Sequence, residues 1–194
     1  MKFLKISYLL FFCLALEAVI VDTGHANVSL VKFESLEGDR SKTLLGIKMD
    51  MQENWHTYWK NPGDSGGPIK VKWSHDNNIS ISKIYWPTPT LIPYEPLMTY
   101  GYKNFVIFPF EITNSNNKNS YIEANIDFLI CDDICVPEKA LIKTNLDEVK
   151  SDPSLNDWFL KVPDQILPVK ASVDSEYINI PVSYTHLRAH ETLE

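Results

Sequence analysis

Two cysteines lie close together in the stretch LICDDICVP, which covers residues 129–137. Cys131 and Cys135 are separated by three residues, and the chain has one other cysteine, Cys13. Two nearby thiols can form a reversible disulfide or a structural bridge. In the chain-entropy description, closing a loop of about five residues stabilises a fold by only ~2 kcal/mol, against ~3 kcal/mol for fifteen residues. The short spacing therefore favours reversible redox chemistry, and a structural bridge stays open as the alternative.

Metal binding is a third use of a cysteine pair. A zinc site needs about four ligands at recognisable spacing, and His56 and His75 have no such spacing relative to the cysteines. Copper(I) prefers soft sulfur ligands, so a site formed by Cys131, Cys135 and Met98 stays open. The interpretation that we favour requires neither a metal nor an organic cofactor.

The chain must reverse direction between the two cysteines if their sulfurs are to bond. Residues four apart in a straight strand are separated by roughly 13 Å, which is too far for a disulfide. A tight hairpin would instead place Cys131 and Cys135 on facing strands, with their Cα atoms roughly 4.5 to 5.5 Å apart. Pro137 and the β-rich residues before the pair argue against a helix.

Two acidic residues, Asp132 and Asp133, would lie in the loop of this hairpin. Both are ordinary turn residues. Their carboxylates would also disfavour a thiolate at the adjacent Cys131. We therefore expect Cys135 to be the thiol that reacts with partner proteins.

The elements that must position this pair are predicted to be strands. Short segments that alternate or run apolar are separated by turn-forming residues, a pattern typical of an antiparallel β-sandwich. These segments are residues 28–34, 42–49, 69–73, 79–85, 105–112 and 120–128. A short helix is predicted at residues 153–160, with Pro153 in its first turn. The glycine-rich residues 61–68 lack the ending of a phosphate-binding loop and are interpreted as a plain loop.

The predicted domain organisation has five parts. Residues 1–26 have two lysines, an apolar run and a small-x-small ending, as a signal peptide does. Residues 27–150 form the main domain, residues 151–168 the helix and a linker, and residues 169–181 the truncated start of a second β domain. Residues 182–194 are interpreted as sequencing-adaptor or vector sequence. Removal of the signal peptide would also remove Cys13, and the oxidising compartment outside the inner membrane would allow the remaining cysteines to pair.

The overall charge excludes some classes of partner. The formal net charge is −7, and the chain has no cluster of lysine or arginine. Nucleic acid and anionic membrane surfaces are therefore not expected as partners.

Four motifs, in this order, resemble the N-terminal periplasmic domain of the DsbD/ScsB family of thiol:disulfide interchange proteins. They are NWHTYWKNPGDSGGP, YWPTPTLI, MTYGYKNFVIFPFEI and IDFLICDDICVPEKALI, and the resemblance covers residues 28–147. It implies an immunoglobulin-like β-sandwich that receives electrons from a membrane-embedded donor domain, in the same chain or another. Such a domain passes the electrons to periplasmic thioredoxin-like disulfide proteins, as part of a protein-disulfide reductase.

The resemblance also assigns roles to residues. The redox cysteines of the family correspond to Cys131 and Cys135, and an aromatic residue near the sulfurs corresponds to Tyr58. The cap loop that covers the disulfide until a partner docks corresponds to five residues, with Met98 and Tyr100 expected to shield the sulfurs: Leu97, Met98, Thr99, Tyr100 and Gly101. Thr99 stands where enteric DsbD members have phenylalanine, and the cysteine spacer is shorter, so the chain is more similar to the ScsB-like branch.

The sequence thus predicts an all-β periplasmic domain, and an inner-membrane anchor on the parent protein stays open. Its function would be thiol:disulfide interchange through a reversible Cys131–Cys135 disulfide. The alternative from another class is a non-catalytic immunoglobulin-like binding module with a structural disulfide or the copper(I) site.

Overall fold

The computed structural model describes residues 19–33, 42–114, 119–159, 161–163, 172–173 and 178–179. The chain divides into two compact units, Met1–Val162 and Pro163–Glu194. Within the described ranges, none of the helices has the length and apolar character needed to cross a membrane.

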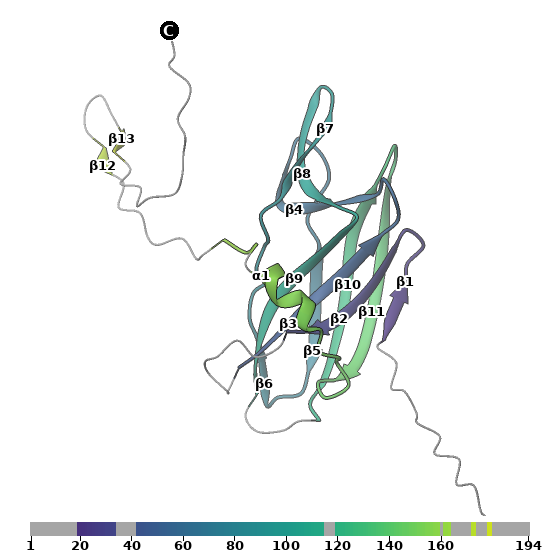
Figure 1. Ribbon diagram of the computed structural model, residues 1–194, viewed down its shortest axis with the longest axis vertical. Coiled ribbons are helices and arrows are strands. Elements are labelled where there is room, and N and C mark those ends of the chain that lie inside the picture. Colours follow the sequence, from purple (N-terminus) through teal and green to yellow (C-terminus); the bar gives the residue numbers. More distant parts are fainter. Residues whose placement is uncertain are drawn as a thin grey trace, which may run out of the picture. The chain divides into compact units, whose positions relative to one another are not determined.

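The first unit contains two antiparallel sheets (Figure 1). The strand order in one sheet is β1 (Ile20–Asp22), β2 (Ala26–Lys32), β3 (Lys42–Met51), β9 (Phe105–Asn114) and β6 (Ile79–Ile81). The order in the other is β11 (Cys135–Asn145), β10 (Tyr121–Cys131), β4 (His56–Gly63), β8 (Leu97–Lys103) and β7 (Thr90–Tyr94), and β5 (Lys70–His75) also pairs with β10. The predicted β-sandwich is confirmed.

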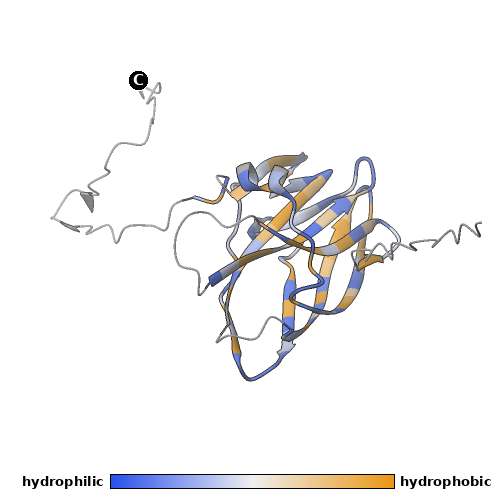
Figure 2. Cartoon of the chain, turned by 60° about the horizontal axis from the view of Figure 1, so that its bottom comes forward, coloured by the Kyte–Doolittle hydropathy of each residue, from blue (hydrophilic) through white to orange (hydrophobic). Residues whose placement is uncertain are grey.

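Alternation of apolar and polar residues explains why these strands form a sandwich. In β10, the buried side chains at even positions are Ile122, Ala124, Ile126, Phe128 and Ile130. They share one core with residues of the other sheet, such as Leu45 and Phe108. Figure 2 shows the same alternation of apolar and hydrophilic residues along the strands. Because side chains of a strand point to opposite faces in turn, each sheet keeps one apolar face for the core.

A short helical segment covers the outer face of the first sheet. It consists of η1 (Pro153–Leu155) and α1 (Asn156–Phe159), close to the predicted residues 153–160. Leu155 packs with Phe33 and Ile107 in a second, smaller core, and the indole N–H of Trp158 donates a hydrogen bond to the backbone oxygen of Ile107 (2.9 Å). Burial of these apolar side chains holds the segment on the sheet.

The folded part of the first unit includes residues on the N-terminal side of the predicted signal-peptide boundary at Ala26. Strand β1 pairs with β2, and Nδ1 of His25 lies 2.5 Å from the buried carboxylate of Glu138. His25 also stacks on Trp55, with ring centroids 3.8 Å apart. Cleavage after Ala26 would remove these contacts. Residues 1–18 of the predicted signal peptide lie outside the described residues.

The described part of the second unit is a short ladder. Strand β12 (Ser172–Val173) pairs antiparallel with β13 (Ile178–Asn179). Both strands fall inside residues 169–181, the predicted start of a second β domain, which stays a prediction. Residues 164–168 of the predicted linker and the predicted artefact at residues 182–194 lie outside the described residues.

Candidate functional site

The two cysteines close the end of a long β-hairpin. Strands β10 and β11 pair without interruption from Tyr121 opposite Asn145 to Cys131 opposite Cys135. The backbone N–H of Asp132 donates a hydrogen bond to the oxygen of Ile134 (3.1 Å), which closes the loop. Cys131 and Cys135 form a disulfide, and their Cα atoms are 4.1 Å apart. The structure thus contains the tight hairpin that the spacing predicts.

The two sulfur-bearing residues differ in exposure. Cys131 is 1% exposed, because β10 is an inner strand and Cys131 also pairs with His56 of β4. Cys135 is exposed at the start of β11, which stands at the end of the strand order in its sheet. A partner protein can therefore approach the disulfide from the Cys135 side.

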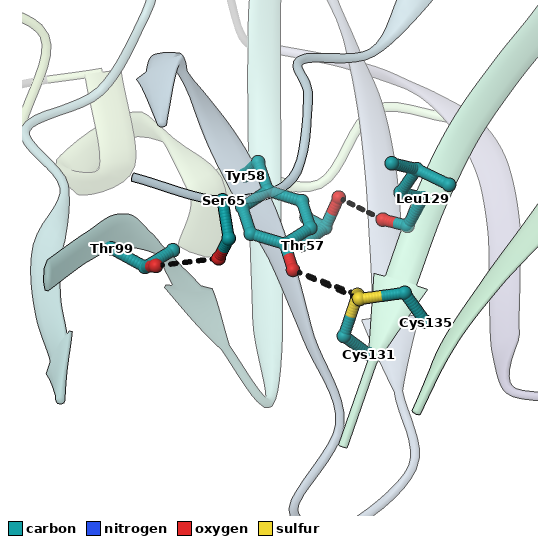
Figure 3. Close-up of a disulfide and its surroundings, with 7 residues drawn as sticks. All are labelled: Thr57, Tyr58, Ser65, Thr99, Leu129, Cys131 and Cys135. Carbon is teal, nitrogen blue, oxygen red and sulfur yellow. Dashed lines mark hydrogen bonds between the residues drawn. A yellow bond between two sulfur atoms is a disulfide. The ribbon is translucent and has the colours of Figure 1, made fainter. Parts of the chain in front are cut away.

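Tyr58 of β4 lies directly against the disulfide (Figure 3). Its hydroxyl donates a hydrogen bond to Sγ of Cys131 (2.8 Å) and lies 3.3 Å from Sγ of Cys135. The side chain is buried, and this burial raises the pKa of Tyr58, although a hydrogen bond with Ser65 opposes the shift. The phenol therefore stays protonated at neutral pH and remains a donor toward sulfur. The predicted position of Tyr58 near the sulfurs agrees with this geometry.

A loop after β4 fixes the position of Tyr58. Gly66 has a φ of +83°, and a Cβ atom there would lie 2.2 Å from two atoms of the Tyr58 ring. Ser65 Oγ lies 2.9 Å from Thr99 Oγ1, and the backbone N–H of Met98 donates to the Asp64 carboxylate (2.8 Å). These contacts connect the loop to both Tyr58 and β8. The sequence predicts residues 61–68 as a plain loop without this role, for which the adjacent Gly66 and Gly67 are the available signal.

The predicted cap loop belongs to an antiparallel hairpin, β7–β8. Its tip and the tip of β10–β11 lie at the same end of the domain (Figure 1). Leu97 and Thr99 line a cavity beside the disulfide, whereas Met98 and Tyr100 are 52% and 40% exposed and do not line it. Alternate residues of a strand point to opposite faces, which explains the difference. The shielding expected of Met98 and Tyr100 does not match this arrangement.

Gly101, the fifth residue of the predicted cap, allows close contact between two strands. It pairs with Tyr58 in the β4–β8 ladder. A Cβ atom at Gly101 would lie 2.1 Å from the backbone oxygen of Thr57. Gly101 therefore serves the packing of β8 against β4.

The cavity beside the disulfide has a volume of about 150 Å³. Its lining residues come from four parts of the chain: His56, Tyr58, Ser65, Ile92, Leu97, Thr99, Cys131, Asp132, Asp133 and Cys135. Burial lowers the pKa of His56, the positive charge of Lys103 lowers it further, and the Asp132 carboxylate opposes both effects. The imidazole next to the disulfide is therefore neutral at neutral pH.

Of the candidate metal ligands, Cys131, Cys135 and His56 line this cavity, and Met98 and His75 do not. Nδ1 of His75 contacts the backbone oxygen of Asp76 at the far end of β5. Among the residues that the structure describes, no three His, Cys, Asp or Glu side chains are grouped as a metal site. The copper(I) alternative lacks its third ligand in this arrangement.

Comparison with known proteins decides the family. Residues 27–146 match the family described as thiol:disulfide interchange protein DsbD, N-terminal. The chain belongs to the DsbD N-terminal family. The match covers nearly the same residues as the resemblance in the motifs. It confirms that resemblance. This DsbD-family chain is therefore a thiol:disulfide interchange domain at the level that the family defines.

One solved structure supports the fold of this DsbD-family domain. The N-terminal periplasmic domain of ScsB from Proteus mirabilis is similar, with a TM-score of 0.56 and 20% sequence identity. The similarity covers 79% of this chain and 61% of that chain, so this chain spans less than two thirds of its solved relative. The GAE domain of GGA2p from Saccharomyces cerevisiae gives a TM-score of 0.35 and 8% identity, over 65% of this chain and 94% of that chain. No curated protein matches the sequence.

The orientation of β8 predicts which cap residues protect the thiols of this DsbD-family domain. In the reduced chain, Leu97→Ala should speed alkylation of the cysteines several-fold, because it removes apolar cover from the cavity that they share. Met98→Ala is the matched control, since Met98 is the next residue on the opposite face. The measurement is the rate of reaction with iodoacetamide. If both variants speed alkylation equally, the face of β8 on which a residue lies does not determine whether it protects the cysteines.

Proposed function

We propose that this chain relays electrons from a membrane-embedded donor to periplasmic thioredoxin-like proteins through the Cys131–Cys135 disulfide. The relay would make it the N-terminal part of a protein-disulfide reductase. Membership of the DsbD N-terminal family supports the chemistry, and the periplasmic location of the similar ScsB domain supports the compartment. The single observation that carries the proposal is the asymmetric disulfide, with Cys135 exposed and Cys131 buried behind it.

The exchange reaction uses two electrons and proceeds through a mixed disulfide. In the reduced chain, the Cys135 thiolate attacks one sulfur of a partner's disulfide, and the other partner sulfur leaves as a thiolate. The Cys131 thiol then loses its proton and attacks Sγ of Cys135, which releases the second partner sulfur. The partner ends as a dithiol, and the Cys131–Cys135 disulfide forms again.

Residues of the cavity have defined tasks in this scheme. Tyr58 donates a hydrogen bond to Sγ of Cys131 and would stabilise negative charge on that sulfur when the disulfide is reduced. Asp132 and Asp133 are exposed beside the pair and disfavour thiolates, which slows reaction with stray oxidants. Leu97 and Thr99 would cover the sulfurs on the β8 side, while a partner docks from the exposed Cys135 side.

The donor side of the relay restores the dithiol. A membrane-embedded dithiol partner would attack Sγ of Cys135 in the oxidised chain, and its second thiol would release the reduced pair. This step again transfers two electrons, and it requires no cofactor bound to the chain. Both partners would therefore use the same exposed sulfur in turn.

A redox titration tests the proposed function. An exchange protein should have a midpoint potential between about −120 and −270 mV, whereas a static structural bridge lies below about −300 mV. The fraction of reduced pair is measured by alkylation after equilibration in glutathione or dithiothreitol buffers. A midpoint below about −300 mV would reject the relay in favour of the structural bridge.

A further inference from the structure

A groove lies along β10 and β11, and its lining begins at Pro137, two residues from the exposed Cys135. Residues at alternate positions of a strand share one face, so Pro137 and Lys139 lie on the same face as Cys135. In the ladder, Pro137 is opposite Leu129 and Lys139 is opposite Asp127. The groove has a volume of about 190 Å³ and is lined by Gly67, Pro68, Lys70, Asp127, Phe128, Leu129, Pro137, Glu138 and Lys139.

The part of the groove nearest Cys135 is apolar. Pro137 and Leu129 form the floor there, and Pro68 comes from the loop between β4 and β5. Pro137 is exposed, and Leu129 and Pro68 are half-buried, so apolar surface faces solvent beside the reactive sulfur. Covering this surface would favour association with a partner segment that carries apolar side chains.

The far part of the groove carries a surplus of positive charge. Lys70, Asp127 and Lys139 lie in one row across β5, β10 and β11. Lys139 Nζ lies 2.9 Å from Asp127, and Lys139, Lys72 and Lys70 together lower the pKa of that carboxyl. The lining of the groove thus has two ammonium groups, those of Lys70 and Lys139, against the one carboxylate of Asp127, in a chain of net charge −7.

The other acidic residues nearby do not cancel this charge in the groove. The buried Glu138 carboxylate is occupied by contacts with His25 and Thr23. Asp132 and Asp133 are exposed in the hairpin loop, between the two cysteines and beyond the groove. The surface is therefore acidic in the hairpin loop and apolar next to Cys135. It is basic at Lys139, which lies four residues, or about 13 Å at about 3.3 Å per residue, from Cys135 along β11.

We infer that this groove binds the segment that flanks the reactive cysteine of a partner protein. The segment is extended, has apolar residues next to its cysteine and has an acidic residue about four positions away that reaches Lys70 and Lys139. This inference rests on the proposed exchange at Cys135 and specifies which disulfide partners that site accepts. Charge complementarity of this kind acts mainly on the association rate.

Two activated peptides test the inference. Each contains one cysteine held as a disulfide with thionitrobenzoate, flanked by apolar residues. In one peptide, the residues four positions before and after the cysteine are Glu. In the other peptide, both are Lys. The Cys135 thiolate of the full chain carrying Cys13→Ser and Cys131→Ser attacks the peptide sulfur, and thionitrobenzoate leaves as a coloured thiolate, so its absorbance gives the rate.

The acidic peptide should react on the order of tenfold faster than the basic peptide at low salt, and the ratio should fall as salt is added. Lys70→Gln together with Lys139→Gln should bring the ratio close to one. Lys143→Gln is the matched control and should leave the ratio unchanged. Lys143 lies on the same strand and face as Lys139 and pairs with Glu123 (3.1 Å), but it is four residues further from Cys135.

The outcomes separate the groove from the exchange reaction. Equal rates, or a faster basic peptide attracted by Asp132 and Asp133, would reject the groove while leaving exchange at Cys135 intact. A second copy of the chain in the groove would appear as a dimer in sedimentation that the double glutamine variant abolishes, and this too would reject the inference. No reaction with either peptide would reject both the groove and the proposed function.

Discussion

Reduced Cys131→Ser is expected to accumulate mixed disulfides with periplasmic thioredoxin-like proteins, whereas Cys135→Ser should accumulate few. All variants also carry Cys13→Ser, so that only the pair can react. Cys131→Ser keeps the exposed thiol and lacks the one that would release the partner. In Cys135→Ser the remaining thiol is 1% exposed and lies against Tyr58, so a partner disulfide cannot reach it. The difference should be close to all or none on non-reducing gels, with captured proteins identified by mass spectrometry.

The variant with both cysteines replaced by serine controls for capture without a disulfide. Equal trapping by the two single variants would show that exposure does not assign the roles. If neither variant traps a protein, the bridge is structural. A small neutral disulfide reagent gives an independent measure, because it should react faster with Cys135 of the first variant than with Cys131 of the second.

Gly66→Ala is expected to destabilise the chain by about 2–4 kcal/mol and to expose the sulfurs. The φ of +83° at Gly66 is strained for alanine, and the new Cβ would lie 2.2 Å from the Tyr58 ring. Tyr58 is fully buried, so the ring cannot move away without disturbing its contact with Cys131. The measurements are denaturant unfolding and the alkylation rate of the reduced chain.

Gly67→Ala is the control for this prediction. A Cβ atom at Gly67 would come no closer than 3.9 Å to Leu129, an ordinary contact, so the free energy of unfolding should change by no more than about 0.5 kcal/mol. Similar losses of stability in the two variants would mean that Gly66 is not a specific support for Tyr58. A loss of stability in Gly66→Ala with an unchanged alkylation rate would mean that Tyr58 does not govern access to the sulfurs.

Strands with strong alternation could be predicted from the sequence, and so could the hairpin at the cysteines. In β10, apolar residues at every second position from Ile122 to Ile130 give a period of two that depends on no distant contact. The cysteine spacing required a reversal of the chain, because a straight strand would hold the sulfurs apart. The helical segment that begins at Pro153 could also be predicted, because proline in a first helical turn is a signal that depends on no distant contact.

The strands that surround the disulfide could not be predicted in this way. Strand β4 runs through Asn61, Pro62 and Gly63, which are turn-forming residues by local preference. Tyr58 pairs with Gly101 of β8 and Gly63 pairs with Thr99, and the register shifts between these two pairs, so the turn-forming residues form an irregularity within the strand instead of ending it. The orientation of Met98 and Tyr100 was also inaccessible, because the phase of a strand is set by its register with a partner. The position of Tyr58 followed only from the family resemblance.

The uninterrupted ladder between β10 and β11 also sets how long a partner stays attached. Backbone hydrogen bonds of the ladder hold the two cysteines opposite each other whether or not their sulfurs are joined. In a mixed disulfide at Cys135, the Cys131 thiol is therefore present at a very high effective molarity relative to any thiol in solution. Release becomes a fast reaction within one molecule, so complexes of the unaltered chain should be too short-lived to isolate. The hairpin that closes the disulfide thus also sets the lifetime of the mixed disulfide with the partner.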